Sequence, residues 1–173
     1  MKTSIALIGF MGTGKTVVGK MLAEKLGKAF VELDAEIEKD VGKTIADIFR
    51  DEGEGRFREV EIAVTASHSG QKNVVIACGG GIVLNNINIF RLKQECVIVC
   101  LSAGLPDILK RVTGGKRPLL NVPDREKRIK ELLEFRRPLY EQAADITLDT
   151  SGIDASGVVQ KILNALRKYE SHD

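Results

Sequence analysis

The chain has 173 residues, of which 43% are hydrophobic and 29% are charged, and its formal net charge is +2. This length and composition predict one globular domain, spanning residues 1–173, with a sizeable core. Acidic and basic residues alternate along most of the chain, so the charge pattern excludes a nucleic-acid footprint. No apolar run approaches the length of a membrane span and no signal-peptide pattern is found, so we expect a cytoplasmic protein without a membrane partner.

Two further expectations come from what the sequence lacks. The three cysteines have no metal-type spacing and lie in or beside apolar runs, which favours reduced core thiols at Cys78, Cys96 and Cys100. No hydrophobic heptad or long edge strand argues for a dimer, so we expect a monomer.

Short apolar runs alternate with longer amphipathic segments, which is typical of an α/β fold with a parallel sheet covered on both faces. The apolar runs predict strands at residues 4–8, 29–33, 73–77, 97–101 and 145–148. The amphipathic segments predict helices at about residues 15–26, 34–40, 44–50, 54–67, 85–93, 105–112, 124–143 and 154–168.

The first strand leads directly into residues 9–16, Gly-Phe-Met-Gly-Thr-Gly-Lys-Thr, which match the phosphate-binding pattern G-x-x-x-x-G-K-[ST]. In such a loop, glycines let successive N–H groups point at a phosphate, and the following helix adds its positive N-terminal end. Lys15 would reach the β- and γ-phosphates, and the Thr16 hydroxyl would ligate Mg²⁺. The sequence therefore predicts a nucleotide triphosphate site.

The second strand ends in acidic residues. Residues two apart on a strand face the same side, so Glu32 and Asp34 are expected to point together toward the carboxyl end of the sheet. One carboxylate could lie near Mg²⁺ and its waters and the other near an attacking hydroxyl. Asp34 could equally serve as the N-cap of the next helix.

Residues 53–61 begin a helix that carries two arginines and three glutamates. Arg56 and Arg58 point to different sides of that helix, so at most one of them is expected to line a site. An ion pair between Arg58 and Glu61 on the surface is the alternative to a binding role.

Three glycines, Gly79, Gly80 and Gly81, follow the third strand. A plain turn needs fewer, and bare backbone at a strand's carboxyl end allows close approach by a small ligand, so we expect a binding role.

Residues 113–123 contain two glycines, two prolines and two cations between helices. Loops of this length in a compact domain are usually functional, and this one could close over a polyphosphate as a lid that carries Arg117. Further along, Pro138 is expected to kink or end the last-but-one helix, and the neighbouring Arg136 could point inward to bind a carboxylate.

Taken together, these motifs make the chain resemble the shikimate kinases. The resemblance rests on five segments in order along the chain: residues 9–16; Asp34 with 37–38 and 45–49; Phe57-Arg58-Glu59-x-Glu61; residues 79–81; and 117–120 with 136–140. It implies a three-layer P-loop kinase fold of the nucleoside-monophosphate-kinase type. That fold has a five-stranded parallel sheet of order 2-3-1-4-5, a mobile lid at about 112–124 and a shikimate-binding region at about 34–61.

The resemblance also implies transfer of the γ-phosphoryl group of ATP to the 3-hydroxyl of shikimate, with Mg²⁺, in aromatic amino acid biosynthesis. It assigns shikimate to Asp34, Arg58, Gly79, Gly80, Gly81 and Arg136. It assigns ATP to Gly12, Thr13, Gly14, Lys15, Thr16, Arg111, Arg117 and Ala155. Lys15, Asp34 and Arg117 would be catalytic, and Thr16 with Glu32, the latter through water, would hold the metal.

Some choices stay open at this point. Arg111 is preferred to Lys110 as the adenine contact, and Glu32 stands where the family often has the shorter aspartate. A gluconate or nucleotide kinase on the same scaffold is the nearest alternative, although three scattered arginines and a glycine triplet suit a compact carboxylate better. A P-loop switch would call for a guanine-reading N-K-x-D motif, and the sequence contains none.

Overall fold

The computed structural model describes residues 2–112 and 118–171. Five parallel strands form one sheet of order β2-β3-β1-β4-β5, as the resemblance implies. The strands are β1 Ser4–Ile8, β2 Ala29–Glu32, β3 Val74–Ala77, β4 Cys96–Ser102 and β5 Ile146–Asp149. β1 lies at the centre, where Leu7 pairs with Ala77 on one side and Val99 on the other.

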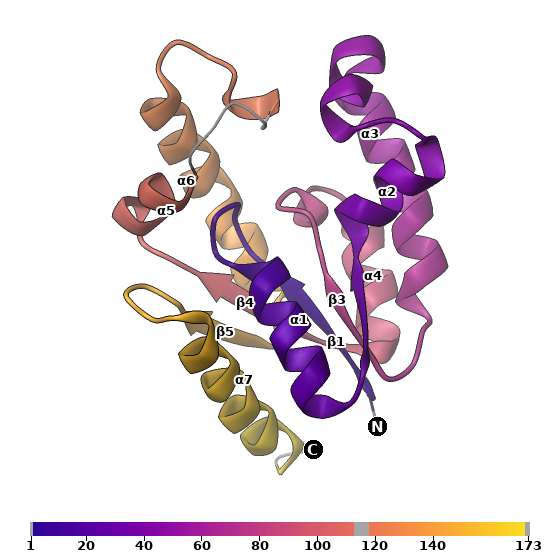
Figure 1. Cartoon of the computed structure of the whole chain (residues 1–173), viewed down its shortest axis with the longest axis vertical. Helices are drawn as coiled ribbons and strands as arrows, with labels where there is room; N and C mark the ends of the chain where they lie inside the picture. Colours follow the sequence, from indigo (N-terminus) through magenta and orange to yellow (C-terminus); the bar gives the residue numbers. More distant parts are fainter. Residues whose placement is uncertain (1, 113–117, 172–173) are drawn as a thin grey trace.

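Seven α-helices and two short 3₁₀ helices connect the strands in the described part of the chain (Figure 1). The α-helices are α1 Lys15–Leu26, α2 Leu33–Val41, α3 Ile45–Ser69, α4 Asn86–Glu95, α5 Leu105–Arg111, α6 Arg125–Ala143 and α7 Ala155–Glu170. The 3₁₀ helices are η1 Ile82–Leu84 and η2 Pro118–Leu120. None of the described helices is long and apolar enough to cross a membrane.

The sheet is the middle of three layers, because alternate side chains of each strand enter opposite cores. Ile5 and Leu7 pack on one face against α1 and α7, while Ala6 and Ile8 pack on the other face against α3, α4 and α6. Both faces of the central strands are therefore apolar. The three cysteines are free and buried, as expected.

Three of the described helices begin at a residue whose side chain caps them. The side chains of Thr44, Asp124 and Asp154 accept hydrogen bonds from backbone N–H groups in the first turns of α3, α6 and α7. Such caps satisfy donors that have no partner within the helix.

The helices expected at 44–50 and 54–67 together form α3 and are separated, as predicted, by a kink at Gly53, whose φ is 84° and ψ is 173°. Other element ends differ from the sequence prediction. The third strand starts at Val74, because Asn73 has a φ of 56°, outside the extended region that a strand needs. Pro138 does not end α6, since buried side chains on both sides of it, Arg136 and Tyr140 among them, hold the helix against the sheet.

Candidate active site

The phosphate-binding loop, residues 9–16, joins β1 to α1 and owes its shape to three glycines. Gly9, Gly12 and Gly14 have φ angles of 140°, 79° and 89°, a region that strongly favours glycine. A Cβ atom on Gly9 would also lie 2.2 Å from the carbonyl oxygen of Leu101. The loop leads into the N-terminus of α1, where unpaired N–H groups form a positive end. The local structure thus provides the anion cradle that the motif predicts.

Lys15, the first residue of α1, turns back over this loop. Its Nζ donates hydrogen bonds to the carbonyl oxygens of Gly9 and Phe10, at 2.8 and 2.9 Å. Thr13 fixes the same stretch, because its hydroxyl donates to the Phe10 carbonyl at 2.8 Å. Lys15 also lines a cavity of about 380 Å³ beside the loop, which we call the smaller cavity. The ammonium therefore lies where a phosphate chain on the loop would pass.

Thr16 and Glu32 lie together in the wall of the smaller cavity, where Thr16 Oγ1 donates a hydrogen bond to Glu32 Oε1 at 2.5 Å. Mg²⁺ prefers hard oxygen donors and usually binds through one or two protein oxygens plus substrate phosphates. Among residues 2–112 and 118–171, no three His, Cys, Asp or Glu side chains gather as a metal cage. The hydroxyl and carboxylate present therefore fit Mg²⁺ shared with a polyphosphate.

Arg111 closes the other side of the smaller cavity. Its guanidinium donates to the Gly12 carbonyl at 3.3 Å and to the Thr150 hydroxyl and carbonyl at 3.4 and 3.3 Å. Thr150 stands shortly before α7, which begins at Ala155. Lys110, the other candidate, is not among the residues that line this cavity. The geometry favours Arg111, which spans the gap between the phosphate-binding loop and the start of α7.

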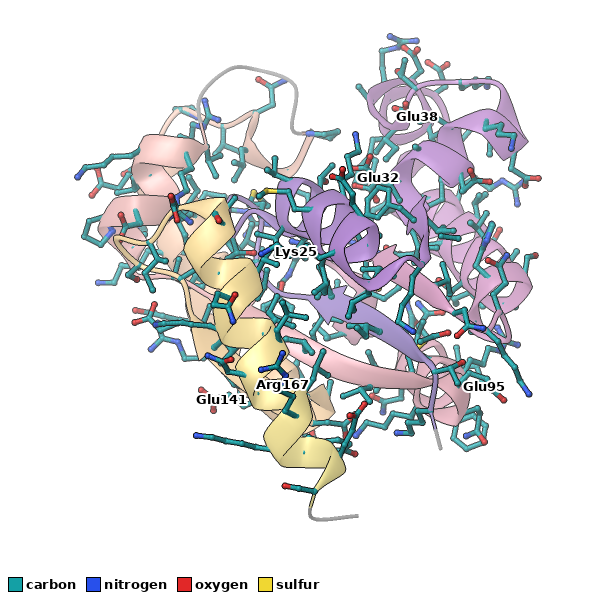
Figure 2. The ribbon with its side chains drawn as sticks, turned by 60° about the horizontal axis from the view of Figure 1, so that its bottom comes forward. Lys25, Glu32, Glu38, Glu95, Glu141 and Arg167 are labelled. Atoms are coloured by element: carbon teal, nitrogen blue, oxygen red, sulfur yellow. The ribbon has the colours of Figure 1, made fainter. Side chains whose placement is uncertain are left out.

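A larger cavity, of about 840 Å³, adjoins the smaller one. Figure 2 shows two of its lining residues, Glu32 and Glu38, at one end of the molecule, far from Glu95 and Arg167. The two cavities share a wall made of Met11, Glu32, Asp34, Gly79 and Gly80. Groups bound in the two cavities would therefore lie next to each other beside these five residues.

Asp34 reaches the shared wall from the first turn of α2. The expectation that Glu32 and Asp34 share one face of a strand is wrong, because β2 ends at Glu32 and α2 begins at Leu33. Asp34 is not the N-cap either, since Glu32 holds that position. Both carboxylates still meet at the carboxyl end of the sheet, because the chain turns into the helix there.

Arg58 lines the larger cavity and is held by two carboxylates of its own helix. Its Nη1 donates to Glu61 at 2.9 Å, and its Nε and Nη2 donate to one oxygen of Glu54 at 3.3 and 3.1 Å. The Arg58 side chain is 13% exposed and that of Glu61 is 1% exposed. The expected pair between Arg58 and Glu61 therefore forms, but inside the site rather than on the surface.

Glu61 is a site residue that the sequence analysis placed only as an ion-pair partner. Burial raises the pKa of this carboxyl, and the nearby Arg58 cation only partly counteracts the effect. Its position gave a usable signal, because Phe57, Val60 and Val64 form an apolar stripe along α3 and Glu61 lies on that stripe. An acidic residue in such a stripe indicates a buried charge.

Arg136 enters the larger cavity from α6 and is 3% exposed. Its Nε is buried and has no hydrogen-bond partner among the described residues. One turn further, the Tyr140 hydroxyl donates to the Gly80 carbonyl, and burial raises the pKa of this hydroxyl. The sequence analysis did not single out Tyr140, which joins α6 to the glycine triplet.

The remaining predicted lid residue, Arg117, lies outside the described residues, which end at Val112 and resume at Pro118. Pro118 and Leu119, directly after it, line the larger cavity. The part of the predicted lid that begins at Pro118 therefore borders the larger cavity.

Comparison with known proteins identifies the family. The family model described as shikimate kinase matches residues 11–167. A shikimate kinase of Thermodesulfovibrio yellowstonii is 48% identical over 168 residues, which cover 96% of this chain and 95% of the relative. The chain belongs to the shikimate kinase family. A solved shikimate kinase from Acinetobacter baumannii, in complex with shikimate, is 39% identical with a TM-score of 0.93, covering 97% of this chain and 94% of that one.

This membership confirms the expected fold and enzyme class, and the family uses ATP with Mg²⁺. It also decides between the classes of protein that the sequence left open. A gluconokinase from Sinorhizobium meliloti is only 17% identical, with a TM-score of 0.61, so it shares the fold alone. Membership of a kinase family also excludes the alternative of a P-loop switch.

Proposed function

We propose that the two cavities are the donor and acceptor sites for the reaction of a shikimate kinase, the transfer of the γ-phosphoryl group of ATP to the 3-hydroxyl of shikimate. The observation that carries this assignment is the shared wall, where Asp34 and Glu32 face both cavities. Phosphoryl transfer needs the attacking oxygen and the phosphorus in line and close together. Two adjoining cavities with a common wall meet that requirement.

On the donor side, the backbone of the phosphate-binding loop holds the phosphates of ATP. Gly12, Thr13 and Gly14 supply N–H groups, and Lys15 exchanges its loop carbonyls for phosphate oxygens. The Lys15 ammonium then stabilises the charge that spreads over the transferring group. Adenine lies against Arg111 and Ala155, and Arg117, which lies outside the described residues, stays a predicted contact of the phosphates.

Thr16 and Glu32 are the residues that would hold Mg²⁺, Thr16 directly and Glu32 through water. When bound, Mg²⁺ neutralises charge on the phosphate oxygens. The hydrogen bond between Thr16 and Glu32 fixes the hydroxyl beside the loop.

On the acceptor side, Arg58 and Arg136 bind the carboxylate of shikimate, and the backbone at Gly79, Gly80 and Gly81 lies along its ring. Asp34 accepts a hydrogen bond from the 3-hydroxyl. As the new bond forms between that oxygen and the γ-phosphorus, the bond from the γ-phosphorus to the β-phosphate oxygen breaks and ADP leaves. The hydroxyl proton passes to Asp34, which needs little basicity because the transition state is loose.

A coupled assay of ADP release tests the assignment, with shikimate, gluconate and nucleoside monophosphates compared as acceptors. Of these acceptors, we expect only shikimate to be phosphorylated, and we expect ADP release to stop when EDTA removes Mg²⁺. Equal ADP release with and without shikimate would refute the proposal that shikimate is the acceptor. The expected monomer can be checked by sedimentation, and cytoplasmic location by fractionation; both stay predictions.

A further inference from the structure

Gly81 occupies a position where its backbone does not call for glycine. Its φ and ψ are −96° and 7°, values that other residues adopt. A Cβ atom built there would lie 2.3 and 2.4 Å from Nη1 and Nη2 of Arg58 and 2.6 Å from its Cζ. These distances are far below van der Waals contact. A side chain at position 81 would therefore force the guanidinium of Arg58 to move.

The guanidinium cannot step aside without consequence. It is 13% exposed and it donates to Glu61, which is 1% exposed, and to Glu54. A displacement large enough to admit a methyl group would break the contact with Glu61 and leave a buried carboxylate without its cation. Removing one partner of a buried pair costs far more than the pair contributes, so Arg58 and position 81 are tightly coupled.

Gly79 has the same relation to the other ionisable groups of the site. A Cβ atom there would lie 2.7 Å from Oδ1 of Asp34 and 3.3 Å from Oε2 of Glu61. Gly80 differs, because its Cβ would meet nothing closer than 3.4 Å, the backbone nitrogen of Met11. At positions 79 and 81, therefore, side chains of the protein itself come close to the glycine backbone.

We propose that Gly79 and Gly81 are positioning residues with separate roles. The missing side chain of Gly79 leaves room for the carboxylate of Asp34, and that of Gly81 leaves room for the guanidinium of Arg58. This inference rests on the proposed function for what Asp34 and Arg58 do. Gly81 then determines how the substrate carboxylate is held, whereas Gly79 determines where the attacking hydroxyl is held. Adjacent glycines in one turn accordingly have different kinetic effects.

Steady-state kinetics give the first test. Loss of a charge-assisted contact in Gly81→Ala should raise KM for shikimate about tenfold, with kcat changed far less. Misplacement of Asp34 in Gly79→Ala should instead lower kcat about tenfold to a hundredfold. KM for ATP should stay unchanged in both. Gly70→Ala, at the end of α3 with a φ of −87° and no atom within 4 Å of its added Cβ, is the matched control and should match the parent enzyme.

Double-mutant cycles test the pairing, with shikimate affinity measured by calorimetry for Gly81→Ala and kcat measured for Gly79→Ala. The effect of Gly81→Ala should disappear on an Arg58→Ala background but persist on an Asp34→Asn background, and Gly79→Ala should show the reverse. If Gly81→Ala weakens binding equally with and without Arg58, the glycine acts on the ligand directly and the inference is wrong. If Gly81→Ala leaves affinity intact while Arg58→Ala weakens it, the inference fails and the proposed function stands. If Arg58→Ala also binds shikimate normally, the proposed function fails with it.

Discussion

Replacing Arg136 by methionine should stabilise the substrate-free enzyme while removing its affinity for shikimate. Arg136 is 3% exposed, and its Nε is buried without a hydrogen-bond partner in the described part of the chain. The guanidinium therefore lies in a poorly hydrated place with incomplete compensation. Methionine has similar length, adapts to the available space and carries no charge.

The magnitude follows from these two observations. A buried donor left unsatisfied costs about 1–3 kcal/mol, and methionine removes that donor together with the desolvation cost of its charge. We expect Arg136→Met to raise the free energy of unfolding by about 2 kcal/mol. For a chain of this size that corresponds to a rise in Tm of about 4–8 °C.

Urea denaturation and calorimetry of shikimate binding measure the two effects on the same samples. Arg137→Met is the control, because Arg137 is the next residue along α6 but is exposed; its stability should stay within about 0.5 kcal/mol of the parent. If Arg136→Met is less stable than the parent, the guanidinium is a net structural contributor and the reasoning about its unsatisfied burial is wrong. If it binds shikimate normally, Arg136 is not part of the acceptor site.

Three further changes test other parts of the site. Lys15→Ala should lower kcat at least about 10²- to 10³-fold, because a preorganised cation at the transferring group is lost, while calorimetry shows unchanged shikimate affinity. Glu61→Gln should become more stable relative to the parent as pH rises from acid to neutral. Because the pKa of Glu61 is raised in the folded protein, the folded protein keeps a proton that the unfolded chain releases. The parent therefore loses stability over that pH interval, and the glutamine variant does not. Parallel urea-denaturation curves across pH would contradict this. Glu32→Asp should increase the Mg²⁺ concentration for half-maximal activity about tenfold, because the shorter side chain withdraws from Thr16; an unchanged Mg²⁺ titration would separate Glu32 from the metal.

The parts of the fold that depend on local sequence were predictable. The strand at residues 4–8 and the helix at 15–26 have the predicted bounds, because an apolar run, three glycines with positive φ and an amphipathic segment follow one another directly. The interruption of α3 at Gly53 was predictable too, because glycine readily adopts the positive φ that breaks a helix. The passage of α6 through Pro138 was not, since it depends on buried neighbours that only the tertiary structure supplies.

The site divides in the same way. The phosphate-binding loop is one continuous segment, so its motif carried the prediction. The burial of Glu61 and the hydrogen bond from Tyr140 to Gly80 depend on how α3 and α6 meet the glycine triplet, and 60 residues separate the last two partners. Arg58 illustrates the limit: its ion pair with Glu61 was foreseen, but spacing along a helix cannot show whether that pair faces solvent or a cavity.

The donor and acceptor halves also differ in what they demand of the fold. The phosphate-binding loop presents backbone N–H groups, which carry no full charge, whereas the acceptor half keeps Glu61 and Arg136 buried and Arg58 mostly buried. A carboxylate that completes the hydrogen bonds of the two arginines should therefore stabilise the fold. At a hundredfold excess over Kd, bound ligand adds about 2.7 kcal/mol. Arg136→Met should consequently unfold later than the parent without shikimate and earlier than the parent when shikimate is saturating, and absence of this reversal would show that the burial of Arg136 is not a cost that the substrate offsets.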